Sequence, residues 1–158
     1  MTVIDARWKA VARGDEPADL EGRLYGCLAS RRWARAVASG QHPDEAMDAL
    51  TDEEWLEAMR AHPRIGERGG DAPVSSEREQ SRAMESSAAT KAALAAENRR
   101  YEERFGHVFL IHASGRSGEE ILAELRRRMS NDPATELAEA KGELRKIAHL
   151  RMRNVLGS

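Results

Sequence analysis

The stretch DPATELAEAKGELRKIAHLRMRNVL, residues 132–156, decides the fold class. Asp132 and Pro133 are typical of a helix start, and no proline follows them inside the stretch. An apolar stripe with helical spacing of three or four residues comes next, at Leu137, Ala140, Leu144 and Ile147. The stretch therefore predicts a long amphipathic helix with one face packed against the rest of the chain.

The remainder of the chain also favours helix. Alanine, leucine, glutamate and arginine dominate, and no segment of useful length alternates apolar and polar residues. One short apolar run, VFLIHA between Gly106 and Gly115, is too short for a helix with its own core, so we expect it to be extended and buried. We predict an all-α fold over residues 1–158, a single-domain multi-helix bundle with one short extended buried segment near 107–114.

Further helices are expected from their capping signals. Ser30 is a cap residue, and Thr51 with Glu54 three residues later forms a capping-box pattern. A long helix is predicted from about Ser76 to Phe105, with alanines at 83, 88, 92 and 95 on its inner face. Leu94, Tyr101 and Phe105 continue that face. The other expected helices start near residue 17 or occupy residues 30–40, 42–50, 51–61 and 117–130.

Composition excludes several function classes. Hydrophobic residues make up 41% and charged residues 33%, as in a folded protein without membrane spans. A net charge of -2 argues against a general nucleic-acid binder, and we interpret the basic clusters at 31–33 and 125–129 as solvated helix faces. Cys27 is the single cysteine, and the first residues lack the apolar core of a secretory signal. We expect a cytoplasmic protein.

His62, in AHPRIG at residues 61–66, is the first candidate for chemistry. It lies on the apolar side of the preceding helix, and Pro63 restricts its backbone to extended geometry. A helix C-terminus favours a charged imidazole, which suits a histidine that exchanges protons. The alternative interpretation is a packed histidine at a helix stop.

Two more residues have both a structural and a functional interpretation. Glu79 stands three residues after Ser76, so it either caps a helix or presents a carboxylate, with Gln80 beside it, to a ligand. Arg151 continues the apolar stripe of the last helix. It either extends to solvent at the helix end or pairs with a carboxylate inside a pocket.

The chain lacks the motifs of several common site types. We find no phosphate-binding glycine loop, no GxSxG and no HExxH, and no two histidines stand at i and i+4. We therefore expect no metal site.

Four blocks together resemble one known family. AHPRIG, SSEREQ, ENRRYEERFGHVFLIHASGR and KIAHLRM occur in this order and at familiar spacings, from about Ser30 to Arg153. The chain resembles 2-oxo-4-hydroxy-4-carboxy-5-ureidoimidazoline (OHCU) decarboxylases, and residues 1–29 match this family less well. The resemblance implies an all-α, cofactor-free carboxy-lyase, commonly a homodimer, that converts OHCU to (S)-allantoin and CO2 in urate degradation.

The resemblance also assigns site residues. The catalytic histidine, glutamate and arginine fall on His62, Glu79 and Arg151. The resemblance places the remaining substrate-binding positions on Pro63, Ser76, Gln80, Phe109, Leu110, Ile111, His112 and Ala113. His112 stands where the family often has a smaller residue. The competing hypotheses are a non-enzymatic helical binding module and a nucleic-acid binder that uses Arg126, Arg127 and Arg128.

Overall fold

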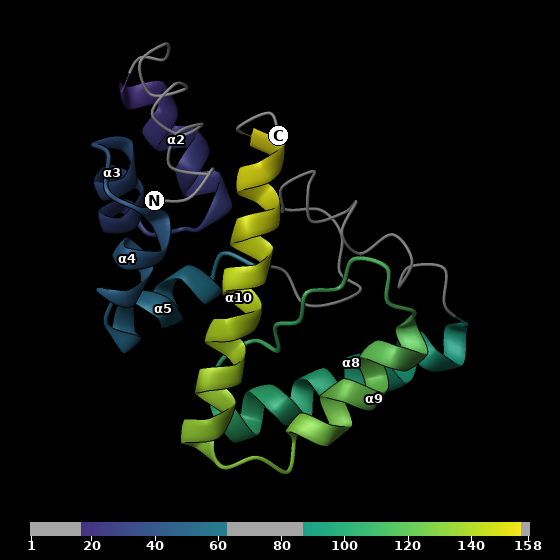
Figure 1. Cartoon of the computed structure of the whole chain (residues 1–158). Coiled ribbons are helices and arrows are strands. Elements are labelled where there is room, and N and C mark those ends of the chain that lie inside the picture. Colours follow the sequence, from purple (N-terminus) through teal and green to yellow (C-terminus); the bar gives the residue numbers. More distant parts are fainter. Residues whose placement is uncertain (1–16, 63–86, 156–158) are drawn as a thin grey trace. The chain divides into compact units, whose positions relative to one another are not determined.

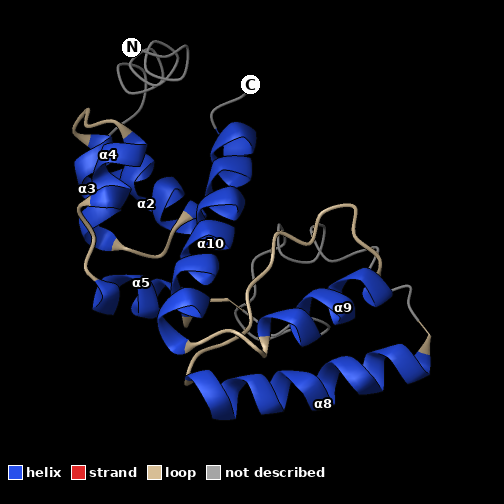
Figure 2. Ribbon diagram, turned by 60° about the horizontal axis from the view of Figure 1, so that its bottom comes forward, coloured by secondary structure: helices blue, strands red, loops and turns tan. Residues whose placement is uncertain are grey.

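The computed structural model describes residues 17–62 and 87–155, and these ranges contain seven helices and no strand (Figures 1 and 2). The helices are α2 (Pro17–Cys27), α3 (Arg31–Ala38), α4 (Pro43–Asp48), α5 (Asp52–Met59), α8 (Ala88–Phe105), α9 (Gly118–Arg128) and α10 (Pro133–Val155). The predicted all-α class is confirmed.

The chain divides into two compact units. One comprises Met1–Ala58 together with Ile147–Ser158, and the other comprises Met59–Lys146. The predicted last helix, α10, begins at Pro133 as expected, and its two parts belong to different units. The prediction that the chain is one domain stays a prediction.

Trp33 organises the helices at the start of the first unit. The Ser30 side chain accepts a hydrogen bond from the Trp33 N–H at 3.2 Å and so caps α3, as its sequence position predicts. The Trp33 ring is fully buried, and its Nε1–H donates to the Pro43 carbonyl at 3.0 Å. Because Pro43 is the first residue of α4, the ring fixes the position of α4 against α3.

Glu54 connects α5 to α3. Its carboxylate accepts the Thr51 N–H at 3.0 Å, and the Thr51 hydroxyl accepts the Glu54 N–H at 3.2 Å, which confirms the predicted capping box. The same carboxylate receives Arg32 Nε and Nη2, each at 2.8 Å. The hydrogen bonds from Arg32, followed by the Thr51 N–H, lower the pKa of Glu54 to about 2.

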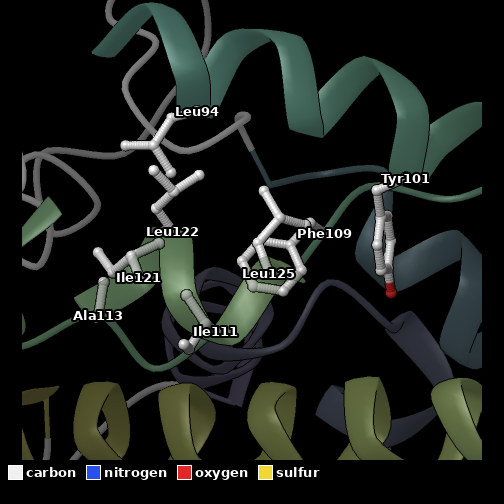
Figure 3. Packing of buried hydrophobic residues seen from close by; sticks show 8 residues of the cluster. All are labelled: Leu94, Tyr101, Phe109, Ile111, Ala113, Ile121, Leu122 and Leu125. Carbon is white, nitrogen blue, oxygen red and sulfur yellow. The ribbon is translucent and has the colours of Figure 1, made fainter. Parts of the chain in front are cut away.

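The core of the second unit lies between α8, α9 and the segment that joins them. The two helices lie side by side in both views (Figures 1 and 2). Figure 3 shows the side chains that meet there, with the Tyr101 hydroxyl pointing away from α8. The cluster consists of Leu94, Tyr101, Phe109, Ile111, Ala113, Ile121, Leu122 and Leu125.

The start predicted for the long helix is wrong. The helix that ends at Phe105 begins at Ala88, and the Ser87 side chain caps it by accepting the Thr90 N–H at 3.1 Å. Ser76 and Ser87 can each cap a helix, and the glutamate three residues after Ser76 favours the earlier start in the sequence. Residues 76–86 lie outside the described residues.

The predicted inner face of that helix is wrong for its alanines and confirmed for Leu94 and Tyr101. Ala88, Ala92 and Ala95 are exposed, whereas Leu94 and Tyr101 are buried. Long apolar side chains remove more surface from water than alanine does, so they decide which face turns inward. Ala83 lies outside the described residues.

One arginine of the cluster at 125–129 does not lie on a solvated face. Arg126 and Arg127 are exposed, and Arg127 pairs with Glu124 and Glu139, each at 2.8 Å. Arg128, however, is only 1% exposed. The interpretation of the whole cluster as solvated is therefore wrong for Arg128. Its burial also removes it from the nucleic-acid surface considered above.

Arg128 and Glu136 form a buried ion pair between α9 and α10. Arg128 Nε donates to Glu136 Oε2 at 2.9 Å, and Nη2 donates to the same oxygen. The Tyr101 hydroxyl donates to this carboxylate as well, and Asn131 Nδ2 reaches Oε1 at 3.1 Å. Burial alone would lower the pKa of Arg128, but the hydrogen bonds and charge of Glu136 outweigh it and raise that pKa. The guanidinium therefore stays charged.

Among the described residues, none of the helices is long and apolar enough to cross a bilayer.

The first prediction concerns the buried ion pair. Arg128→Met leaves the Glu136 carboxylate buried without its cation, so the free energy of unfolding should fall by about 3–5 kcal/mol. The double variant Arg128→Met/Glu136→Leu should recover much of this loss because no charge is left buried. Urea unfolding followed by circular dichroism measures both variants. Arg126→Met is the exposed control and should change the value by less than about 0.5 kcal/mol.

The second prediction concerns pH. The pKa of Glu54 is lower in the folded protein than its ordinary value, so its stabilising effect is complete above that value. The effect is lost as the pH falls from the ordinary pKa of 4.5 to about 2. Glu54→Gln should lower Tm by roughly 2–4 °C at pH 7, and the difference from the unmodified chain should shrink on acidification. Glu57→Gln, on the same helix and exposed, is the control. A difference that stays constant down to pH 3 would refute the assignment.

Candidate active site

The segment from Phe109 to Ala113 is the part of the predicted site that the structure describes most fully. Gly106 ends α8 with a φ of 80°, and its N–H donates to the Glu102 carbonyl at 2.8 Å. A left-handed residue at this place favours glycine and turns the chain out of the helix. Residues 108–113 then contain neither helix nor strand, and four of the five residues from Phe109 to Ala113 are buried. The predicted short buried segment is confirmed.

The side chains of this segment alternate. Phe109, Ile111 and Ala113 all belong to the core cluster with α8 and α9, whereas Leu110 and His112 do not. Such a period of two is typical of an extended chain. The odd-numbered residues therefore anchor the segment, and the even-numbered residues face another direction.

The backbone of the segment is held by side chains from outside it. Arg128 Nη1 donates to the Leu110 carbonyl at 2.6 Å, and its guanidinium carbon lies 4.6 Å from the centre of the Phe109 ring. The Glu143 carboxylate accepts the His112 N–H at 2.9 Å, and Arg116 Nε donates to the His112 carbonyl at 3.2 Å. Helices α9 and α10 thus both fix this segment.

His112 carries a buried polar atom. The residue as a whole is half-buried, yet its Nε2 is inaccessible to solvent and has no hydrogen-bond partner among the described residues. An unsatisfied buried nitrogen costs free energy, and such groups in native proteins need an explanation. This is the position at which the sequence departs from the resembled family.

His62 follows the end of α5. Its N–H donates to the Met59 carbonyl at 3.1 Å, which continues the last turn of the helix, and the residue is half-buried. The imidazole is therefore carried by a backbone tied to a helix C-terminus, where carbonyl oxygens favour a positive charge. The helix stop predicted from the sequence is confirmed, and the catalytic role of His62 stays a prediction.

Arg151 is buried, with only 6% of its surface exposed. Its Nη1 donates to the Gly26 carbonyl, near the end of α2, at a long distance of 3.4 Å. The interpretation that Arg151 extends to solvent is wrong, because the side chain is buried and reaches the Gly26 carbonyl. A buried guanidinium needs oxygen partners, which is the environment that the alternative interpretation requires.

The remaining predicted residues lie outside the described residues. These are Pro63, Ser76, Glu79 and Gln80. Of the predicted residues that the structure describes, Phe109 to Ala113 and His62 belong to the second unit, and Arg151 belongs to the first.

Sequence reasoning missed Arg128, Glu136 and Glu143, the residues that support the segment. One signal was present: Glu136, Ala140 and Leu144 are spaced four residues apart and all are buried. The apolar stripe predicted from the sequence begins at Leu137, one residue after Glu136. A glutamate is normally expected to face solvent, so the sequence gives no reason to include it in the buried row. Only its partner on α9 explains its position.

The acidic and sulfur-bearing side chains do not form a metal centre in the described part of the chain. There, no group of three or more histidine, cysteine, aspartate or glutamate residues is placed to hold an ion. The imidazole of His149, two residues before Arg151, is paired with an aspartate: its Nε2 lies 2.7 Å from Asp44 Oδ1.

Comparison with known proteins assigns the family. The family model for OHCU decarboxylase matches residues 16–153, which is most of the chain. The chain belongs to the OHCU decarboxylase family. Membership makes it an enzyme of the decarboxylase class. The predicted family and enzyme class are confirmed.

Individual relatives agree with this family. The chain is 33% identical over 141 residues to the 2-oxo-4-hydroxy-4-carboxy-5-ureidoimidazoline decarboxylase of Mus musculus, covering 83% of this chain and 79% of that protein. It is 41% identical over 105 residues to the uric acid degradation bifunctional protein TTL of Arabidopsis thaliana. That match covers 63% of this chain and 32% of the longer plant protein.

Solved structures share the fold. The crystal structure of OHCU decarboxylase in the presence of (S)-allantoin matches with a TM-score of 0.74 and 32% identity, over 91% of this chain and 100% of that one. The crystal structure of (S)-allantoin synthase matches with a TM-score of 0.70 and covers 93% of this chain and 53% of that one. Because its identity is 18%, this second likeness concerns the fold alone.

Proposed function

We propose that this member of the OHCU decarboxylase family converts OHCU to (S)-allantoin and CO2, without a cofactor, as a cytoplasmic homodimer. The observation that carries the proposal is the family match over residues 16–153, which includes every residue given a role below. The substrate, the absence of a cofactor, the dimer and the location are inferred from the family.

The chemistry of the substrate explains why no cofactor is needed. The carboxylate of OHCU stands on a carbon that also bears a hydroxyl group and adjoins a C=N bond. When the C–CO2 bond breaks, its electron pair moves into this C=N bond, and the nitrogen takes up a proton. The resulting enol then gains a proton on carbon while the hydroxyl group loses one. Pyridoxal or thiamine normally supplies such an electron sink, and here the substrate contains its own.

We assign three roles to side chains. His62 exchanges a proton with the substrate hydroxyl group or ring nitrogen, a role suited to an imidazole held at a helix end. Arg151 binds an anionic or carbonyl group of the substrate, because its planar guanidinium matches a carboxylate in two places. Glu79 hydrogen-bonds the ureido or ring N–H groups.

The remaining predicted residues shape the binding site in this proposal. Residues Phe109 to Ala113 line the ring of the substrate with backbone groups, as the family resemblance implies. Pro63 restricts the backbone of His62, and Ser76 and Gln80 accompany Glu79. Protonation of the enol on one face accounts for a single enantiomer of the product.

The third prediction tests the reaction. OHCU is generated from urate with urate oxidase and hydroxyisourate hydrolase, and circular dichroism follows the optical activity after this protein is added. We expect a rapid rise of a single-enantiomer signal, also after dialysis against a chelator. His62→Asn should reduce the rate by about 10²–10⁴ because it removes an acid–base group.

The control for this variant is His42→Asn. His42 caps α4 by accepting the Asp44 N–H on Nδ1, and asparagine is a good capping residue. This variant should keep the full rate. No acceleration by the unmodified protein would reject the proposed reaction, and full activity of folded His62→Asn would remove His62 from it.

The fourth prediction concerns Arg151. Arg151→Lys keeps the charge but loses the planar fork, so KM should rise by about tenfold or more. Steady-state kinetics and a thermal melt are measured together. Arg153→Lys, exposed on the same helix, is the control and should leave both unchanged. A lower Tm with unchanged kcat and KM would make Arg151 a structural residue only.

A further inference from the structure

Glu143 makes a contact that no role described above requires. Its side chain, on α10, is 14% exposed, and Oε1 accepts the His112 N–H at 2.9 Å. Oε2 lies 2.6 Å from Lys146 Nζ, one turn further along the helix. A carboxylate on one helix thus reaches the backbone of a segment 31 residues earlier in the chain.

Glu143 is ionised at this place. Burial opposes the charge, but Lys146 and the His112 N–H outweigh burial, so the pKa of Glu143 is lowered. An ionised carboxylate is only an acceptor, and its bond to a backbone N–H is stronger than one between neutral groups. The hydrogen bond from the His112 N–H to the Glu143 carboxylate is therefore directional, and it persists near neutral pH.

The contacts along the segment follow its alternation. Side chains from outside the segment form hydrogen bonds with three of its backbone groups: the Leu110 carbonyl, the His112 N–H and the His112 carbonyl. In an extended chain the N–H and C=O of alternate residues point to the same edge. The N–H and C=O of Ile111 therefore point to the other edge. The hydrogen bonds at residues 110 and 112 fix the position of that edge.

We infer that Glu143 is a positioning residue, which holds the backbone at His112 so that the opposite edge of the segment is presented to the substrate in one fixed place. This inference rests on the proposed function, because it takes the segment to line the substrate site. Glu143 acts through the backbone of His112 and does not touch the substrate.

Three substitutions separate this role from general stabilisation. Glu143→Ala removes the acceptor for the His112 N–H and the partner of Lys146. Glu143→Gln keeps an oxygen that accepts the N–H but removes the charge. Lys146→Met removes the ion pair at a largely exposed position and leaves the carboxylate that accepts the His112 N–H.

The expected result is a graded loss of activity. In Glu143→Ala the segment shifts, and kcat/KM for OHCU should fall by roughly 10–100-fold. Glu143→Gln should recover most of this loss, and Lys146→Met should stay within about twofold of the unmodified chain. Melting temperatures measured on the same samples identify any change due to stability. Equal kcat/KM for Glu143→Ala and the unmodified chain overturns the inference, as does an equal loss in Glu143→Gln.

Amide hydrogen exchange provides a second measurement that needs no turnover. The His112 amide should be protected in the unmodified chain and in Glu143→Gln, and it should exchange faster in Glu143→Ala. Equal protection in all three proteins overturns the inference even if the chain is active. If the unmodified chain does not decarboxylate OHCU, the proposed function fails, and the pattern of protection still shows whether Glu143 holds the segment.

Discussion

The ion pair between Arg128 and Glu136 is the interaction on which the second unit depends. It joins the end of α9 to the start of α10, and both side chains are almost fully removed from water. Such a pair is stable only when its remaining hydrogen-bonding groups are satisfied, and here Tyr101, Asn131 and the Leu110 carbonyl provide the partners. Replacing one member alone would leave the other as a buried, unpaired charge. Arg128 and Glu136 can therefore be replaced without a large loss of stability only when both are replaced together.

The same pair connects stability to the candidate site. Arg128 uses one nitrogen for the Leu110 carbonyl and places its guanidinium over the Phe109 ring. The conformation of the buried segment is therefore fixed by the ion pair that joins α9 and α10. Because Glu143 holds the next part of the segment from α10, both ends of the segment depend on the same two helices. A short stretch without regular structure can in this way be as well positioned as a helix.

Local signals in the sequence predicted much of the fold. Ser30 and Thr51 cap their helices as expected, because a capping side chain bonds to a backbone N–H only two or three residues away. The predicted start of α8 is wrong, because Ser76 has the glutamate of a capping box and Ser87, which caps the helix, does not. Leu94 and Tyr101 indicate the buried face of α8 correctly from the sequence, whereas only the packing against α9 shows that Ala88, Ala92 and Ala95 stay exposed.

For the candidate site, the order and spacing of the motifs by themselves determined the family, and they identified His62, Glu79 and Arg151 as residues to test. The sequence alone also determined the all-α class, because composition and periodicity act over one or two helical turns. Only the tertiary structure decided that Arg151 is buried and that Arg128, Glu136 and Glu143 support the segment from Phe109 to Ala113. A charged residue has the same appearance in a sequence whether it faces water or a buried partner. The difference depends on which side chain, distant along the chain, the fold brings within hydrogen-bonding distance.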